Sequence, residues 1–143
     1  MDNNIDIRLL TQAQRIADMY SDKLDIDKRN QLYNAIQVCR EFVEDCSTDW
    51  GILYDAIQGD EGIWEYADYP EFSEELQNMW VLETDILSCI CYNACTMQEP
   101  STPQDLEIRG ENIAKFAEFI ESNFFGESDY QKCFDFWDEN MCY

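Results

Sequence analysis

The most restrictive feature of the sequence is the run of residues 73–98, in which apolar side chains recur at helical spacing with Glu83 as the outlier. Between Ile86 and Cys95 this run is apolar on nearly every side, which is typical of a helix packed against several neighbours. Alternating segments of β-branched residues, which would indicate strands, are absent, and valine is scarce. The sequence therefore predicts an all-α fold built around a long central helix.

Shorter helical patterns flank this run on both sides. The expected segments are residues 5–20, 28–46, 50–58, 61–69, 111–122 and 129–139. Asp27 is expected to cap the second of them, and Pro70 to end the fourth. Residues 100–109 contain two prolines and are followed by Gly110, which indicates a loop. No repeat or linker divides the chain, so residues 1–143 are expected to form a single compact domain of six to seven helices.

The middle of the chain lacks basic residues. Residues 41–108 contain neither lysine nor arginine, while carboxylates recur throughout, and the whole chain has a formal net charge of −22. Such a charge repels nucleic acid and anionic membranes, so neither is expected as a partner. It favours basic proteins, above all nucleic-acid-binding proteins with exposed phosphate sites. The alternative is that the acidic residues only keep a small domain soluble, and composition leaves both interpretations open.

Aromatic residues are interleaved with these acids. The tryptophans and tyrosines concerned are Trp50, Tyr54, Trp64, Tyr66, Tyr69 and Trp80. They can anchor a protein interface, where such residues dominate the binding energy, or they can fill the core beneath short helices. Trp64, Tyr66 and Tyr69 fall where the acids are densest, so at least one of them is expected to be exposed.

The sequence offers no recognisable catalytic or cofactor site. Histidine is absent, which excludes Ser-His-Asp and Cys-His nucleophile arrangements as well as HExxH zinc sites. No EF-hand loop or glycine-rich phosphate loop is present, and candidate carboxylate pairs are too numerous to single one out. The expectation is a protein without catalytic, cofactor-binding or metal-binding residues, and not an enzyme.

The seven cysteines are expected to be reduced and buried in the core. Their odd number and their placement in helical segments differ from a secreted disulfide framework, and no second cysteine pair completes a zinc site. The N-terminus lacks the basic start and apolar stretch of a signal peptide, and no apolar run is long enough to span a bilayer. A cytoplasmic location is expected.

Four segments carry a family resemblance. They are residues 33–45 (YNAIQVCREFVED), 50–67 (WGILYDAIQGDEGIWEYA), 86–94 (ILSCICYNA) and 103–107 (PQDLE). In this order they resemble an all-α immunity-protein family of bacterial polymorphic toxin and contact-dependent growth inhibition systems, the sixth in the numbered immunity series. The resemblance covers about residues 10–122 and is sharpest in the PQDLE segment. It implies a cytoplasmic protein that binds and neutralises a cognate toxin domain, often a nuclease.

The charge pattern and the resemblance together predict an acidic surface that covers the basic active site of a nuclease toxin. The expected toxin-binding residues lie in the segment of short helices and are Asp55, Asp60, Glu61, Trp64, Glu65, Asp68, Tyr69, Glu71, Glu74 and Glu75, with Trp64 or Tyr69 as the anchor. Two alternatives stay open. One is a DNA-mimic inhibitor of a DNA-binding or defence protein, and the other is an acidic helical scaffold or adaptor with an apolar partner. The protein is expected to be a monomer or a weak homodimer.

Overall fold

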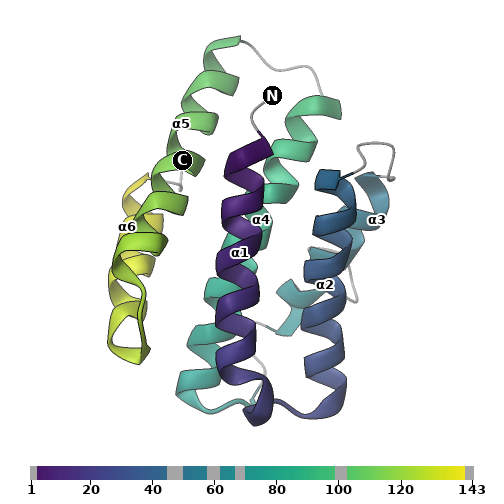
Figure 1. Ribbon diagram of the computed structural model, residues 1–143, viewed down its shortest axis with the longest axis vertical. Coiled ribbons are helices and arrows are strands. Elements are labelled where there is room, and N and C mark those ends of the chain that lie inside the picture. Colours follow the sequence, from purple (N-terminus) through teal and green to yellow (C-terminus); the bar gives the residue numbers. More distant parts are fainter. Residues whose placement is uncertain (1–2, 45–49, 58–61, 67–69, 99–102, 141–143) are drawn as a thin grey trace.

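A computed structural model describes residues 3–44, 50–57, 62–66, 70–98 and 103–140 of the chain (Figure 1). Six α-helices run through these residues: α1 (Asn3–Tyr20), α2 (Ile26–Glu44), α3 (Trp50–Ile57), α4 (Glu74–Gln98), α5 (Pro103–Asn123) and α6 (Tyr130–Asn140). Three short 3-10 helices accompany them, namely η1 (Ser21–Lys23), η2 (Ile63–Tyr66) and η3 (Glu127–Asp129). No strand occurs in the described ranges, and the all-α prediction is confirmed.

The long helix α4 lies at the centre of this arrangement. It contacts α1, α2, α3, α5 and α6, and in Figure 1 it stands behind α1, which is flanked by α2 and α5. The side chains of Trp80, Ile86 and Ile90 on α4 are fully buried. A helix that is apolar on nearly every side needs neighbours on several sides to cover it. The prediction of a long central helix is therefore confirmed.

Local capping explains where two of the helices start. The Ser73 hydroxyl accepts a hydrogen bond from the Leu76 amide at 3.3 Å, so Ser73 caps α4. At α2 the capping residue is Asp25, whose Oδ1 accepts a hydrogen bond from the Lys28 amide at 2.9 Å. The expectation that Asp27 caps this helix is wrong, because Asp27 already lies within its first turn.

The loop expected at residues 100–109 is wrong over most of its length. Helix α5 begins at Pro103 and runs on through Gly110. Proline is well tolerated at the first position of a helix, where its missing N–H would have no intrahelical partner in any case. Gly110 lies on the exposed side, while the fully buried Ile113 and Phe116 hold the helix in the core. Of the helix expected at residues 61–69, the described part is the 3-10 helix η2.

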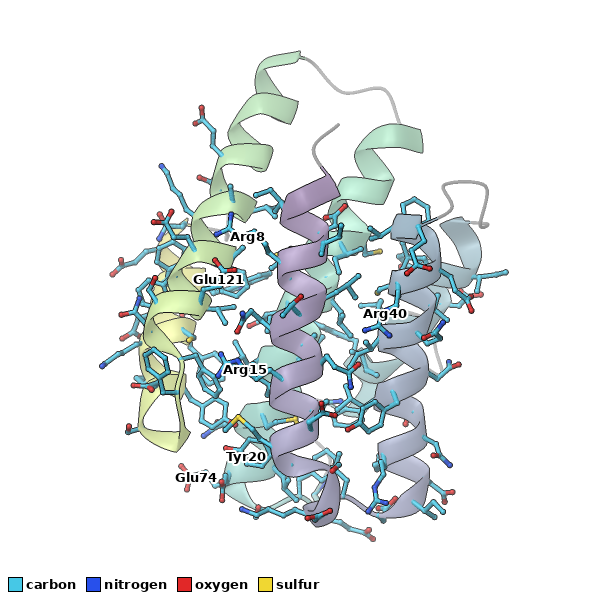
Figure 2. All side chains as sticks on the ribbon, in the orientation of Figure 1. Arg8, Arg15, Tyr20, Arg40, Glu74 and Glu121 are labelled. Carbon is cyan, nitrogen blue, oxygen red and sulfur yellow. The ribbon has the colours of Figure 1, made fainter. Side chains whose placement is uncertain are left out.

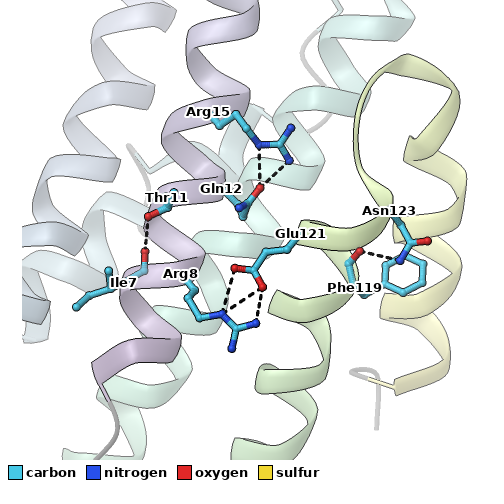
Figure 3. Close-up of polar contacts among 8 residues, drawn as sticks. All are labelled: Ile7, Arg8, Thr11, Gln12, Arg15, Phe119, Glu121 and Asn123. Atoms are coloured by element: carbon cyan, nitrogen blue, oxygen red, sulfur yellow. Dashed lines mark hydrogen bonds and ion pairs between the residues drawn. The ribbon is translucent and has the colours of Figure 1, made fainter.

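Polar contacts join α1 to α5 (Figure 3) and to Phe124, the residue that follows α5. The Arg8 guanidinium donates from Nε and Nη2 to the Glu121 carboxylate, with Nε 3.1 Å from Oε2. These hydrogen bonds lower the pKa of Glu121. Arg15 donates to the backbone carbonyl of Phe124 at 2.9 Å, and its guanidinium also lies over the ring of that residue. Helix α1 is thereby held against α5.

The cysteines whose side chains the structure describes lie in the core. They are Cys39, Cys89, Cys91 and Cys133, all of them buried. Burial raises the pKa of Cys39 and Cys89, and raises that of Cys133 to about 12, which keeps these groups in the unreactive thiol form. The prediction of buried core thiols is confirmed for these four. The side chains of the other three cysteines lie outside the described residues.

Candidate functional site

The segment of short helices is organised around Trp80. This side chain is fully buried on α4, and its Nε1 donates a hydrogen bond to the backbone carbonyl of Ile63 at 2.7 Å. The centroid of the Phe72 ring lies 5.3 Å from that of the indole, with 45° between the ring planes. Trp80 therefore belongs to the core and not to an interface. It ties η2 and the turn before α4 to the central helix.

Helix α3 and η2 approach each other at Gly62. A Cβ atom built at this glycine would lie 2.8 Å from the backbone carbonyl oxygens of Asp55 and Ile57. These are backbone atoms at the end of α3, which cannot move aside as the tip of a side chain could. The absence of a side chain at Gly62 therefore lets η2 approach the last turn of α3, and Ile57 and Ile63 on either side of the glycine are fully buried.

Substitution of Gly62 by alanine is expected to destabilise the protein by about 1–3 kcal/mol, because the added methyl group must displace the backbone of α3. Gly110 provides a matched control. No atom lies within 4 Å of a Cβ built there, and Gly110 is inside α5, so Gly110→Ala should stabilise the protein by up to about 1 kcal/mol. Urea denaturation of both variants measures the two effects. Equal stability of Gly62→Ala and the parent would contradict the close approach of η2 to α3.

Large apolar side chains on α3 and η2 face solvent. Trp64 is 55% exposed, Ile52 is 55% exposed and Tyr54 is 38% exposed. Helix α3 contacts η2, so the three side chains come from adjoining elements. Trp64 meets the expectation that the acid-rich segment exposes at least one aromatic residue. Exposed aromatic and aliphatic side chains are enriched at protein interaction sites.

Two of the predicted acidic residues accompany these side chains. Asp55 is exposed on α3, and Glu71 is exposed in the turn before α4, next to the Phe72 ring that packs on Trp80. We refer to Ile52, Tyr54, Asp55, Trp64 and Glu71 together as the α3–η2 surface.

Two other predicted residues face different neighbours. Glu74, labelled in Figure 2 at the start of α4, is exposed and lines a groove with Ser128 and Gln131 near the start of α6. The Glu75 carboxylate lies 3.5 Å from Nζ of Lys23 in η1. The structure thus groups Glu74 with α6 and Glu75 with η1.

Five predicted residues lie outside the side chains that the structure describes. Glu65 is part of η2, but its side chain is not described. The other four lie in segments that the structure does not describe, and they are Asp60, Glu61, Asp68 and Tyr69. Their place in the toxin-binding surface stays a prediction.

A second exposed apolar region, which no sequence pattern singled out, lies in a groove between α1 and α2. The groove has a volume of about 980 Å³, and its lining includes Ile7, Leu10, Met19 and Val43 together with Arg15, Arg40, Asp18 and Glu44. Ile7 is 51% exposed and Met19 is 44% exposed. Both fall off the buried stripe of α1, formed by Leu9, Ala13, Ile16, Ala17 and Tyr20. That displacement from the stripe is the sequence signal that could have found them.

Two carboxyl groups lie inside the protein on α4. Glu83 is fully buried, and neither of its oxygens has a hydrogen-bond partner among the described residues. Burial, with the charge of Asp18, raises the pKa of Glu83 well above its ordinary value. Burial, with the charge of Asp138, raises the pKa of Asp85 to about 7. Raised pKa values recur at catalytic sites, but Glu83 has no exposed surface at which a substrate could reach it. We therefore expect the buried carboxyl to lower the stability of the fold.

Neither a metal cluster nor a membrane span occurs in the described part of the chain. In that part of the chain, no group of three or more cysteine, aspartate or glutamate side chains is arranged to hold a metal ion. No helix there is both long enough and apolar enough to cross a membrane.

Comparison with known proteins identifies a family. Residues 8–123 of the chain match the family described as Immunity protein Imm6. The matched range extends from α1 to the last residue of α5 and includes both the α3–η2 surface and the groove between α1 and α2, apart from Ile7. No curated protein and no solved structure matches the chain.

Proposed function

The chain belongs to the Imm6 immunity protein family, and from this premise we propose that it binds the catalytic domain of a cognate nuclease toxin and blocks its active site. Inhibition is stoichiometric, and the protein itself catalyses nothing. It acts in the cytoplasm of the cell that makes it, where the toxin would otherwise reach nucleic acid.

The observation that carries this proposal is the α3–η2 surface. It combines the exposed side chains of Trp64, Ile52 and Tyr54 with the carboxylates of Asp55 and Glu71. It lies in a stretch of 68 residues without lysine or arginine, in a chain of net charge −22. Aromatic residues and charge together suit an interface in which rings supply most of the binding energy and charges orient the partner.

Electrostatics explains why a nuclease fits this surface. A nuclease holds the phosphates of its substrate with basic side chains, so its active site attracts an acidic protein. Such attraction can raise association rates to about 10⁸–10⁹ M⁻¹s⁻¹ at low salt. A standard interface buries roughly 800 Å² on each partner, enough to cover an active-site opening. Slow dissociation depends on the aromatic anchors, because exposed charges mainly affect the association rate.

Two variants separate these contributions. Reversal of charge in Asp55→Lys with Glu71→Lys is expected to slow association with the cognate toxin domain about tenfold at low salt. Trp64→Ala is expected to speed dissociation about thirtyfold, as loss of a central aromatic anchor costs about 2 kcal/mol. Surface plasmon resonance gives both rates, and survival of cells that co-express toxin and variant gives the loss of protection.

The matched control for charge is Asp135→Lys with Glu139→Lys, which makes the same change on the exposed side of α6. It should leave toxin binding and protection intact. Full protection by Trp64→Ala and by Asp55→Lys with Glu71→Lys would refute the assignment of the surface. Binding to many unrelated basic proteins, in competition with plain DNA, would instead indicate a DNA mimic.

A further inference from the structure

The groove between α1 and α2 exposes the apolar side chains of Ile7 and Met19. We propose that it is a self-association surface, at which two copies of the chain pair about a two-fold axis with their α1 helices antiparallel. The occupant of the groove in one copy is helix α1 of the other.

The groove provides apolar surface at both of its ends. Ile7 and Met19 are about half exposed, whereas Leu10 and Val43 between and beside them are buried and form its floor. Twelve residues separate Ile7 from Met19, which is about 18 Å along a helix. A second helix of that length can cover both exposed side chains at once.

The groove also contains two arginines, Arg15 and Arg40. Among the described residues, their guanidinium groups donate hydrogen bonds only to uncharged acceptors. The Arg40 guanidinium, labelled in Figure 2, donates to Oε1 of Gln37 and of Gln14, each at 3.3 Å. Arg15 donates to Oε1 of Gln12 (Figure 3) and to the backbone carbonyl of Phe124. A guanidinium has five N–H donors, so both side chains can take up a carboxylate as well.

Carboxylates line the same groove. Asp18 and Glu44 are exposed there, and Oδ1 of Asp18 accepts hydrogen bonds from Gln14 Nε2 at 3.0 Å and from the Tyr33 hydroxyl at 2.7 Å. One surface therefore holds both the donors and the acceptors of a potential set of ion pairs. A two-fold interface needs this property, because the same patch must complement itself.

The positions of the residues along α1 select the antiparallel arrangement. Ile7 and Met19 are equally distant from Ala13 along α1, so a two-fold axis at the level of Ala13 places Ile7 of one copy at the level of Met19 of the other. A parallel arrangement would set the groove residue Asp18 of one copy against Asp18 of the other, and like charges in contact are unfavourable.

The net charge of the chain predicts an unusual salt dependence. Two copies that each carry −22 repel each other, and salt screens this repulsion over about 8 Å at physiological ionic strength. Self-association is therefore expected to strengthen as salt rises. Docking of the acidic α3–η2 surface on a basic toxin should weaken with salt, so the two interactions respond in opposite directions.

Sedimentation equilibrium of the full chain tests the proposal between about 0.05 M and about 0.5 M NaCl. We expect a monomer–dimer equilibrium that shifts toward dimer at the higher salt. Ile7→Glu and Met19→Glu should each raise the dissociation constant about tenfold or more, because a charge then replaces buried apolar surface. The control Ile26→Glu makes the same change at an isoleucine that is 68% exposed outside the groove, and it should dimerise like the parent.

A purely monomeric parent at about 1 mM chain and high salt would overturn the proposal, as would equal weakening by Ile26→Glu and Met19→Glu. Loss of dimer in Met19→Glu with intact toxin protection would support self-association apart from the proposed function. Loss of protection in Trp64→Ala with intact dimer would support the toxin-binding surface alone.

Cross-linking tests the position of the axis. Gln14 lies one residue from Ala13, so Gln14→Cys should link to its counterpart through a short bismaleimide, above the background of the parent chain. Met19→Cys should stay at background, because two copies of position 19 would lie about 18 Å apart along the helices. Stronger linking at position 19 than at position 14 would overturn the antiparallel arrangement.

Discussion

Asp85→Asn is expected to raise the free energy of unfolding at pH 8 by on the order of 4 kcal/mol, and to change it much less near pH 4. Asp85 is 7% exposed, and burial together with the charge of Asp138 raises its pKa to about 7 from an ordinary value of 3.8. A difference of about three pH units corresponds to about 4 kcal/mol. Asparagine does not ionise, so it avoids this cost.

The direction of the effect follows from the proton that Asp85 binds. Below about pH 4 the carboxyl is protonated in the folded and the unfolded chain alike, and its burial carries no charge penalty. Between about pH 4 and pH 7 the unfolded chain releases the proton while the folded chain keeps it, so stability falls as pH rises. Above pH 7 the whole penalty is present. Glu83, whose pKa is raised by burial as well, acts in the same direction.

Glu121 affects stability in the opposite direction, at low pH. The hydrogen bonds from Arg8 lower its pKa below the ordinary value of 4.5, so its contribution to stability is present above that value and is lost as pH falls below it. Stability of the parent should therefore be greatest at mildly acidic pH, between the range in which Glu121 becomes protonated and the range in which Asp85 ionises.

Urea denaturation at about pH 4.5, 6 and 8 measures the prediction for Asp85. The parent should lose stability across this range, and Asp85→Asn should lose much less. Asp135→Asn, at an exposed carboxylate on α6, is the control and should follow the parent. Parallel pH profiles of Asp85→Asn and the parent would show that the Asp85 carboxyl does not limit stability at neutral pH.

The central helix could be predicted from sequence because its pattern is unambiguous. Between Ile86 and Cys95 almost no polar side chain is available to face water, and only a helix surrounded by others satisfies that pattern. The start of α5 could not be predicted in this way. Pro103 and Gly110 are local signals for a loop, and burial of Ile113 and Phe116 outweighs them. Local propensity is worth at most about 1 kcal/mol at Gly110, less than the burial of one large side chain.

The candidate site was predictable in composition but not in arrangement. The acids and aromatics of the short helices mark a region of interest, yet the same pattern fits either core or surface. Trp80 is fully buried and its indole donates to the Ile63 carbonyl, whereas Trp64, one residue beyond Ile63, is 55% exposed. Glu74 and Glu75 follow the turn by only a few residues and still face α6 and η1. Such differences depend on tertiary contacts that spacing along the chain does not encode.

Trp80→Ala is expected to lower the free energy of unfolding by about 3–5 kcal/mol, because it opens a cavity in the core and removes the donor to Ile63. Trp80→Phe is the more informative change. Phenylalanine keeps an aromatic ring beside Phe72 but has no N–H, so the Ile63 carbonyl loses its bond at a cost of about 1–3 kcal/mol. Helix η2 should then be held less firmly against α4.

This loosening of η2 should also affect Trp64, which follows Ile63 in the sequence. The Trp64 side chain is 55% exposed. If Trp64 anchors the toxin, Trp80→Phe must speed toxin dissociation although Trp80 itself has no exposed surface. Hydrogen exchange of the amides of residues 62–66 should rise in the same variant. Trp137→Phe makes an equal chemical change on α6, where the indole packs edge-on against Phe116, and it should alter neither quantity. Unchanged exchange at residues 62–66 in Trp80→Phe would mean that packing at Gly62 alone positions η2, and the hydrogen bond to Ile63 would then have no part in presenting Trp64.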